Sequence, residues 1–171
     1  NKINFIGLNN NSESTLLSLM PFEIGQNFSE NISDEIIESL FSTGFFSNIS
    51  IVKNKNSLDI TVKENPNIKY FDINLNTDKG FLAWINAEKL YLTSEMLDEY
   101  LEENELSAGS IFTERKLKNF ILLLEAKYSA SGYYNFKITQ DIKIDVQNRV
   151  GISLNITQGK PAIIDSFNIS G

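Results

Sequence analysis

The chain offers few side chains of the kinds that carry out chemistry. It contains no cysteine and no histidine, which excludes disulfides, thiolate nucleophiles, the usual zinc sites and histidine-based acid or base catalysis. One pair, Ser50 and Lys53, matches the Ser-x-x-Lys motif of certain acyl enzymes. That chemistry needs a helix, whereas the alternating residues here predict a strand, on which positions three apart face opposite sides. We therefore expect no nucleophile at this position.

Acidic side chains gather in one later segment of the chain. They are Glu95, Asp98, Glu99, Glu102, Glu103 and Glu105. The segment lacks the Asp-rich glycine loop of a calcium site, so we interpret it as a solvated helix face. A hydrolase using carboxylates is an alternative reading, but it needs two acids converging in a pocket, and no such pair is evident. The sequence predicts no enzyme, no catalytic residue, no metal ligand and no cofactor.

The net charge of the chain argues against nucleic acid as a partner. The chain has 171 residues, a formal net charge of −7, a pI near 4.7 and scattered basic residues, which disfavours nucleic acid binding. Its 42% hydrophobic content is ordinary for a globular protein. No apolar run approaches the roughly 20 residues of a membrane-spanning helix, and Asn1-Lys2-Ile3 lacks the regions of a signal peptide.

The elements that position these residues occur twice in the same order. In Leu40–Ile51 and again in Lys127–Ile138, a helical pattern reaches Gly44 or Gly132 and aromatic residues follow. The first copy predicts a strand over 3–7, a helix over 14–20, a helix capped by Ser29, and strands over 49–53 and 58–63. The second predicts a strand over 71–75, helices capped by Ser94 and Thr113, and strands over 136–144 and 150–156. The predicted fold class is α+β, with two tandem βααββ domains.

The repeats define the expected domains. We place the first at 1–65, the second at 66–159 with an inserted stretch at 77–92, and the first strand of a truncated third copy at 160–171. Because the chain starts and ends inside a strand pattern, we expect it to be a fragment. Glu64, Asn65 and Pro66 form the predicted interdomain linker, which the proline stiffens.

The inserted stretch is the feature that breaks the repeat. It carries Phe81, Leu82, Trp84 and Ile85, apolar residues in a connection that otherwise needs none. Such residues require a partner surface, either in their own domain or as an exposed docking site. Both readings stay open.

Two stretches carry a resemblance to a known family. Leu40-Phe41-Ser42-Thr43-Gly44-Phe45-Phe46 with Leu58 through Pro66, and Asn148-Arg149-Val150 through Gln158-Gly159-Lys160-Pro161-Ala162, resemble the polypeptide-transport-associated (POTRA) repeats of bacterial outer-membrane barrel-assembly proteins. The resemblance covers essentially the whole chain. It implies, for each repeat, a three-stranded mixed sheet in the order first, third, second strand, with two helices on one face.

The resemblance also implies a role. POTRA repeats lie in the periplasm, continue into further repeats and a membrane barrel, gather accessory lipoproteins and guide unfolded outer-membrane proteins to insertion. The alternatives are the periplasmic region of another transporter, such as a two-partner secretion pore, and a passive spacer.

The second strand of each repeat would then lie at a sheet edge, where an extended peptide could add through main-chain hydrogen bonds. The candidate edge residues are Ser47, Asn48, Ile49, Ser50, Ile51, Val52 and Lys53 in the first repeat, and Asn135, Phe136, Lys137, Ile138 and Thr139 in the second. The other interpretation is that they are ordinary edges protected by nearby lysines.

Overall fold

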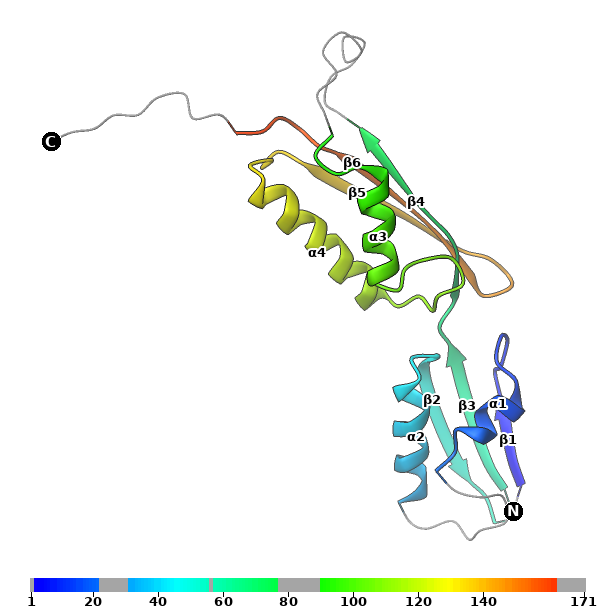
Figure 1. The fold of residues 1–171 in the computed structure, drawn as a ribbon. Helices are drawn as coiled ribbons and strands as arrows, with labels where there is room; N and C mark the ends of the chain where they lie inside the picture. The colour runs from blue at the N-terminus through cyan, green and yellow to red at the C-terminus, as the bar shows by residue number, and fades with distance from the viewer. Residues whose placement is uncertain (1, 22–30, 56, 77–89, 163–171) are drawn as a thin grey trace, which may run out of the picture. The chain divides into compact units, whose positions relative to one another are not determined.

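The computed structural model describes residues 2–21, 31–55, 57–76 and 90–162 (Figure 1). The chain divides into two compact units: the first unit is Asn1–Asn67 with Ile144–Arg149, and the second unit is Ile68–Lys143 with Val150–Gly171. No helix within the described residues is both long enough and apolar enough to cross a membrane.

The first unit follows the predicted order of elements. They are β1 (Lys2–Ile6), α1 (Glu13–Ser18), α2 (Ile32–Ser42), β2 (Phe46–Lys53) and β3 (Ser57–Glu64). The sheet has the order β1-β3-β2, with β1 parallel and β2 antiparallel to β3. Phe5 and Ile51 both lie opposite Ile60, which fixes the register across the sheet. The expected mixed sheet is confirmed.

The core of the first unit comes from two periodicities. Ile32, Ile36 and Leu40 repeat every fourth residue along α2 and are buried. Leu58, Ile60 and Val62 alternate along β3 and are buried as well. On the opposite face of the sheet Asn4 Nδ2 donates to Asp59 Oδ1 at 2.6 Å. Helices therefore cover one face, and the other face is polar.

The second unit repeats this architecture. Its elements are β4 (Asn67–Asn76), α3 (Ser94–Glu103), α4 (Glu114–Ala130), β5 (Lys137–Ile144) and β6 (Arg149–Thr157). The sheet order is β4-β6-β5. Asn74 Nδ2 donates to Asn155 Oδ1 at 3.2 Å, and the Gln158 amide donates to the Asn76 carbonyl at 3.0 Å, so β4 and β6 run in the same direction.

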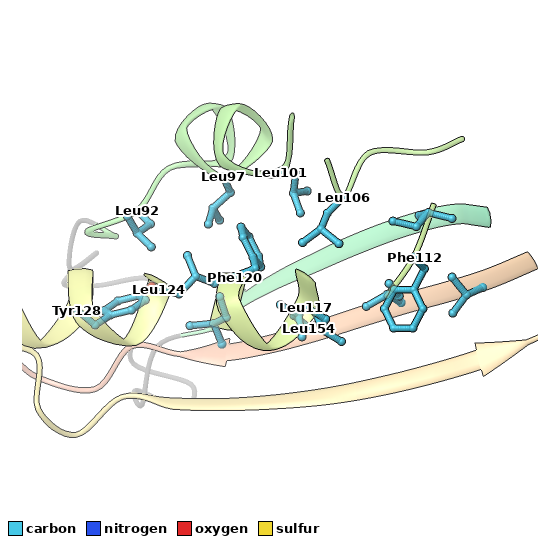
Figure 2. Close-up of a cluster of buried hydrophobic side chains, with 14 residues drawn as sticks. Leu92, Leu97, Leu101, Leu106, Phe112, Leu117, Phe120, Leu124, Tyr128 and Leu154 are labelled. Atoms are coloured by element: carbon cyan, nitrogen blue, oxygen red, sulfur yellow. The ribbon is translucent and has the colours of Figure 1, made fainter. Parts of the chain in front are cut away.

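The larger core lies between the helices and the sheet of the second unit. Figure 2 shows Leu97 and Leu101 of α3 meeting Leu117, Phe120 and Leu124 of α4 above the strands. Val150, Ile152, Leu154 and Ile156 of β6 are fully buried beneath them. The central strand of the sheet is therefore apolar on the helix side along its length.

Both long helices end as the glycines predict. Gly44 follows α2 with φ +72°, and Gly132 follows α4 with φ +83°, a backbone region that glycine enters without steric cost. Thr113 caps α4 as expected, accepting from the Lys116 amide at 3.2 Å. The predicted cap at Ser94 is wrong, because Thr93 accepts from the Met96 amide and Ser94 is the first helical residue.

Other boundaries differ by a few residues from the predictions. The first helix spans Glu13–Ser18 rather than 14–20, because Ser12 accepts from the Thr15 amide and so sets the start of the helix. Asn31 stands at the N-cap of α2, while Ser29 lies outside the described residues. Residues 77–89, with Phe81, Leu82, Trp84 and Ile85, and residues 163–171 also lie outside them.

Candidate functional site

Strand β5 is an open edge of the second sheet. It neighbours only β6 in the order β4-β6-β5, and every one of its side chains except Ile138 is exposed. On its outer face Lys143 contacts Asp141 at 2.7 Å, and this hydrogen bond raises the pKa of Lys143. An edge strand presents unpaired N–H and C=O groups along one side. Strand β5 therefore has one side that no neighbouring strand of its sheet covers.

A hollow of about 470 Å³, which we call the β5 hollow, lies between β5 and α4. Its lining residues are Glu114, Leu117, Lys118, Ile121, Leu122, Glu125, Gln140 and Ile142. Leu122 is 51% exposed and Ile142 is 36% exposed, so apolar surface stands open to solvent in the lining. Two acidic residues and one basic residue also line the hollow. The hollow could receive apolar side chains of a strand that pairs with β5.

The periodicity of α4 explains why Leu122 is left in this hollow. Leu117, Phe120, Leu124 and Tyr128 form the buried face of the helix. Leu122 lies two positions from both Phe120 and Leu124, which turns its side chain away from that face. The sequence does contain a signal, because Ile121-Leu122-Leu123 gives the helix more apolar residues than its buried face uses.

The first-repeat edge residues all lie on β2. Ile49 and Ile51 pack against the core of the first unit, and Ser47 Oγ donates to the Lys63 carbonyl at 3.1 Å. Ser50 lies opposite Thr61 and Lys53 opposite Leu58 in the antiparallel ladder. The strand predicted for this pair is confirmed, and the two side chains face opposite sides of the sheet.

The second-repeat candidates fall into two groups. Lys137, Ile138 and Thr139 begin β5, but Asn135 and Phe136 precede it. The Phe136 ring stacks on Tyr128 with centroids 5.5 Å apart, which draws this residue into the core before the strand begins. The strand predicted over 136–144 therefore begins one residue later, at Lys137, and the candidate edge residues Asn135 and Phe136 lie outside β5. Gln140 and Ile142, which line the β5 hollow, were not among the predicted site residues.

The predicted linker is shorter than expected. Glu64 is the last residue of β3 and is only 4% exposed, so it is part of the first unit's fold. Its carboxylate accepts from the Asn10 amide at 2.7 Å, the Asn11 amide at 3.0 Å and Asn11 Nδ2 at 3.0 Å. Asn65 donates from Nδ2 to the Gly44 carbonyl at 2.9 Å and from its amide to the Phe45 carbonyl at 2.7 Å. Only Pro66 then separates these bonds from β4.

The corresponding position in the second unit carries Gln158. It follows β6, is 1% exposed, and its Oε1 accepts from the Tyr91 amide at 2.7 Å. In both units a buried polar side chain at the end of the third strand therefore accepts from the backbone of the segment that follows the first strand. These residues stabilise the fold of their own units, and neither lines the β5 hollow.

Charged groups elsewhere form local pairs. Lys116 Nζ donates to Glu105 Oε2 at 2.6 Å, and this hydrogen bond lowers the pKa of Glu105. Arg149 donates to Asp145, which lowers the pKa of that carboxyl group. Across the ranges that the structure describes, no group of three or more Asp or Glu side chains is placed to hold a metal ion.

Comparison with known proteins identifies the family. The model of the POTRA family, described as a surface antigen variable number repeat, matches residues 1–65 and 83–159. The outer membrane protein assembly factor BamA of Neisseria meningitidis is 28% identical over 165 residues, which cover 96% of this chain and 19% of that protein. BamA of Buchnera aphidicola is also 28% identical, over 99% of this chain and 25% of that protein.

The chain thus spans about a fifth to a quarter of the length of these relatives. Among solved structures, the N-terminal domain of Omp85 from Thermosynechococcus elongatus has a TM-score of 0.50 and 16% identity, covering 90% of this chain and 60% of that one. That likeness concerns the fold alone. Because the family model matches both repeats, the chain belongs to the POTRA family.

Proposed function

We propose that this chain is the periplasmic POTRA region of an outer-membrane protein assembly factor. In this role it acts as a scaffold that binds unfolded barrel proteins and accessory lipoproteins and guides the former to insertion. Support comes from the BamA relatives, which match nearly the whole chain. The observation that carries the molecular part of the proposal is the open edge of β5 beside the β5 hollow.

An unfolded barrel protein is a suitable ligand for such an edge. Its strands alternate apolar and polar residues, so a strand added to β5 would direct alternate side chains toward α4. Those side chains would meet Leu117, Ile121 and Leu122, while main-chain hydrogen bonds form along β5. Main-chain pairing depends little on sequence, which fits a scaffold that handles many different clients.

The energetics favour transient binding. About five new main-chain bonds at roughly 0.5–1.5 kcal/mol each, together with one apolar side chain in the hollow at about 1.5–3 kcal/mol, stabilise the complex. Association costs on the order of 4–15 kcal/mol. These contributions nearly cancel, so we expect weak binding that allows a client to be released.

Edge β2 of the first unit is a less suitable acceptor. Its helix-side residues Ile49 and Ile51 pack directly against the core of the first unit. On β5 the corresponding helix-side residues, Gln140 and Ile142, line an open hollow. A strand added to β2 would gain the same type of main-chain bonds, but beside helix-side residues that already pack into the core.

An amide NMR titration tests the proposal. The probe is a blocked nine-residue peptide that alternates Leu with Thr, added to millimolar concentration. We expect shifts along Lys137–Ile144 and in α4 near Leu122. Absence of shifts would refute strand addition and support the passive spacer.

Two variants make the test specific. Leu122→Glu places a charge in the β5 hollow and should abolish the shifts. Ala126→Glu is the matched control, because Ala126 is exposed on the same helix and does not line the hollow. Equal binding by both variants would show that the hollow is not the site.

A further inference from the structure

The opposite edge of the second sheet carries a different hollow. Strand β4 ends the order β4-β6-β5 on that side. Four consecutive residues of β4, Lys69 to Asp72, line a hollow of about 410 Å³ together with Leu101 of α3. We call it the β4 hollow. Side chains of consecutive strand residues point to opposite faces of the sheet. A hollow lined by four consecutive residues therefore borders the backbone edge of β4 as well as its side chains.

The chain itself makes backbone hydrogen bonds along this edge, to the turn at residues 107–110. The Ile68 amide donates to the Ser110 carbonyl at 2.8 Å, and the Gly109 amide donates to the Ile68 carbonyl at 2.7 Å. These two bonds lie at the end of β4 that adjoins the hollow. Ile68 therefore directs both its backbone groups outward, away from β6, and the edge continues from there into the β4 hollow.

The charge of the β4 hollow differs from that of the β5 hollow. Its acidic residues are Asp72, Asp98 and Glu102, and Lys69 is the one basic residue among its described lining. Asp98 and Glu102 lie one turn apart on α3, and both are exposed. The negative potential of these carboxylates would attract a cationic segment and repel an acidic one.

Apolar side chains add to the lining of this hollow. The Tyr70 ring is not one of them, because it lies against Gly151 of β6, on the face of the sheet away from α3. Apolar contact would come from Phe71 and Leu101, so the stem of a long cationic side chain has a surface to cover.

We propose that the β4 hollow is a second docking site, for an extended segment of a partner protein that carries lysine or arginine. The segment adds to the β4 edge beyond Ile68 and places its cationic side chains against Asp98 and Glu102. The second unit then has two acceptor edges, one selecting apolar side chains and one selecting positive charge. This site does not depend on client binding at β5.

A pair of peptides tests the charge preference on the whole chain. One blocked nine-residue peptide alternates Lys with Thr, and the other alternates Glu with Thr. In an amide NMR titration at low ionic strength, we expect the lysine peptide to shift Tyr70–Asp72 and Leu101–Ala108. The glutamate peptide should leave these residues unchanged. Equal shifts with both peptides, no shifts with either, or shifts confined to β5 would each overturn the proposal.

Variants of matched charge separate the site from general attraction to an acidic helix. The double variant Asp98→Asn with Glu102→Gln should weaken binding of the lysine peptide about 2- to 30-fold, because each exposed ion pair is worth about 0.2–1 kcal/mol. Glu99→Gln with Glu103→Gln removes the same charge from exposed positions of α3 outside the hollow. If this control weakens binding as much, the hollow is not the site.

The two proposals can fail separately. Shifts with the Leu-Thr peptide report on β5, whereas shifts with the Lys-Thr peptide report on β4. The variant Leu122→Glu should leave binding of the lysine peptide at Tyr70–Asp72 unchanged. Loss of that binding in Leu122→Glu would show that the cationic peptide uses the β5 hollow instead.

Discussion

Glu64 is the one buried polar side chain among the described residues of the first unit. Its carboxylate is nearly buried at the end of β3 and accepts three hydrogen bonds from Asn10 and Asn11. All three donors are N–H groups, so the residue must offer acceptors on both of its oxygens. A carboxylate does so, whereas the glutamine amide has one oxygen and one NH₂ group. We predict that Glu64→Gln destabilises the first unit.

The magnitude follows from the bonds that are lost. The glutamine side chain can accept hydrogen bonds at its one oxygen. Its NH₂ group would face a backbone or side-chain N–H, and two donors cannot form a hydrogen bond. Hydrogen bonds to charged groups contribute about 1.5–3 kcal/mol each. Losing one or two of them, with partial replacement by water near exposed Asn10, should lower the free energy of unfolding by about 2–4 kcal/mol. A domain of this size loses roughly 4–8 °C in melting temperature per kcal/mol.

Residue-resolved urea denaturation followed by NMR measures this effect in each unit. The amide of Ile49 reports on the first unit and the amide of Ile152 on the second. Only the first midpoint should fall. Glu38→Gln is the control, because Glu38 is exposed on α2 and the chemical change is identical. The reasoning is refuted if Glu64→Gln unfolds at the wild-type midpoint, or if it lowers both midpoints equally.

Three further predictions concern other contacts. Gly151→Ala would place a Cβ 2.3 Å from the Tyr70 ring, so it should lower the urea midpoint of the second unit by the equivalent of about 1–3 kcal/mol, and Tyr70→Ala should relieve most of that loss. Tyr128 has a buried hydroxyl that makes no hydrogen bond within the described residues, and burial raises its pKa from 10.0 to about 12. The stabilisation that comes from this raised pKa should therefore be fully present below pH 10. It should be lost between about pH 10 and 12, because the unfolded chain loses the Tyr128 proton first. In Tyr128→Phe the urea midpoint should decrease less over this pH range. An equal decrease in the variant and the wild type would show that other groups cause it. Asn65→Ala removes the bond to the Gly44 carbonyl and should cost the first unit about 0.5–1.5 kcal/mol. Lower ¹⁵N order parameters at residue 65 would accompany it, whereas an unchanged midpoint would show that the main-chain bond to Phe45 suffices.

The sequence predicted what depends on local periodicity. Alternation at Leu58, Ile60 and Val62 and four-residue spacing at Ile32, Ile36 and Leu40 identified the elements of the first unit. The cap at Thr113 and the helix end at Gly132 were also predictable, because capping is a local interaction. The choice between Thr93 and Ser94 was not, since both residues can cap and only the backbone conformation decides.

Local sequence patterns could not predict contacts between residues that are far apart in the chain. Glu64 reads as a linker residue because it is charged and precedes a proline, yet its burial is set by backbone groups more than fifty positions away. The β5 hollow needs a helix flank and a strand edge that come from separate segments. Its signal in the sequence, the surplus apolar residue Leu122, could have indicated an exposed apolar side chain but not what it faces.

Selectivity in a strand-adding domain must come from the surroundings of the edge. Main-chain bonds are nearly the same for every sequence, so they fix affinity within a narrow range and distinguish few ligands. The β5 hollow presents Leu122 and Ile142, whereas the β4 hollow presents Asp98 and Glu102. Under the two proposals, the two edges of one small sheet would bind two chemically different segments by the same backbone interaction. Changes in these lining residues should alter which segment binds while leaving the ability of the edge to pair intact.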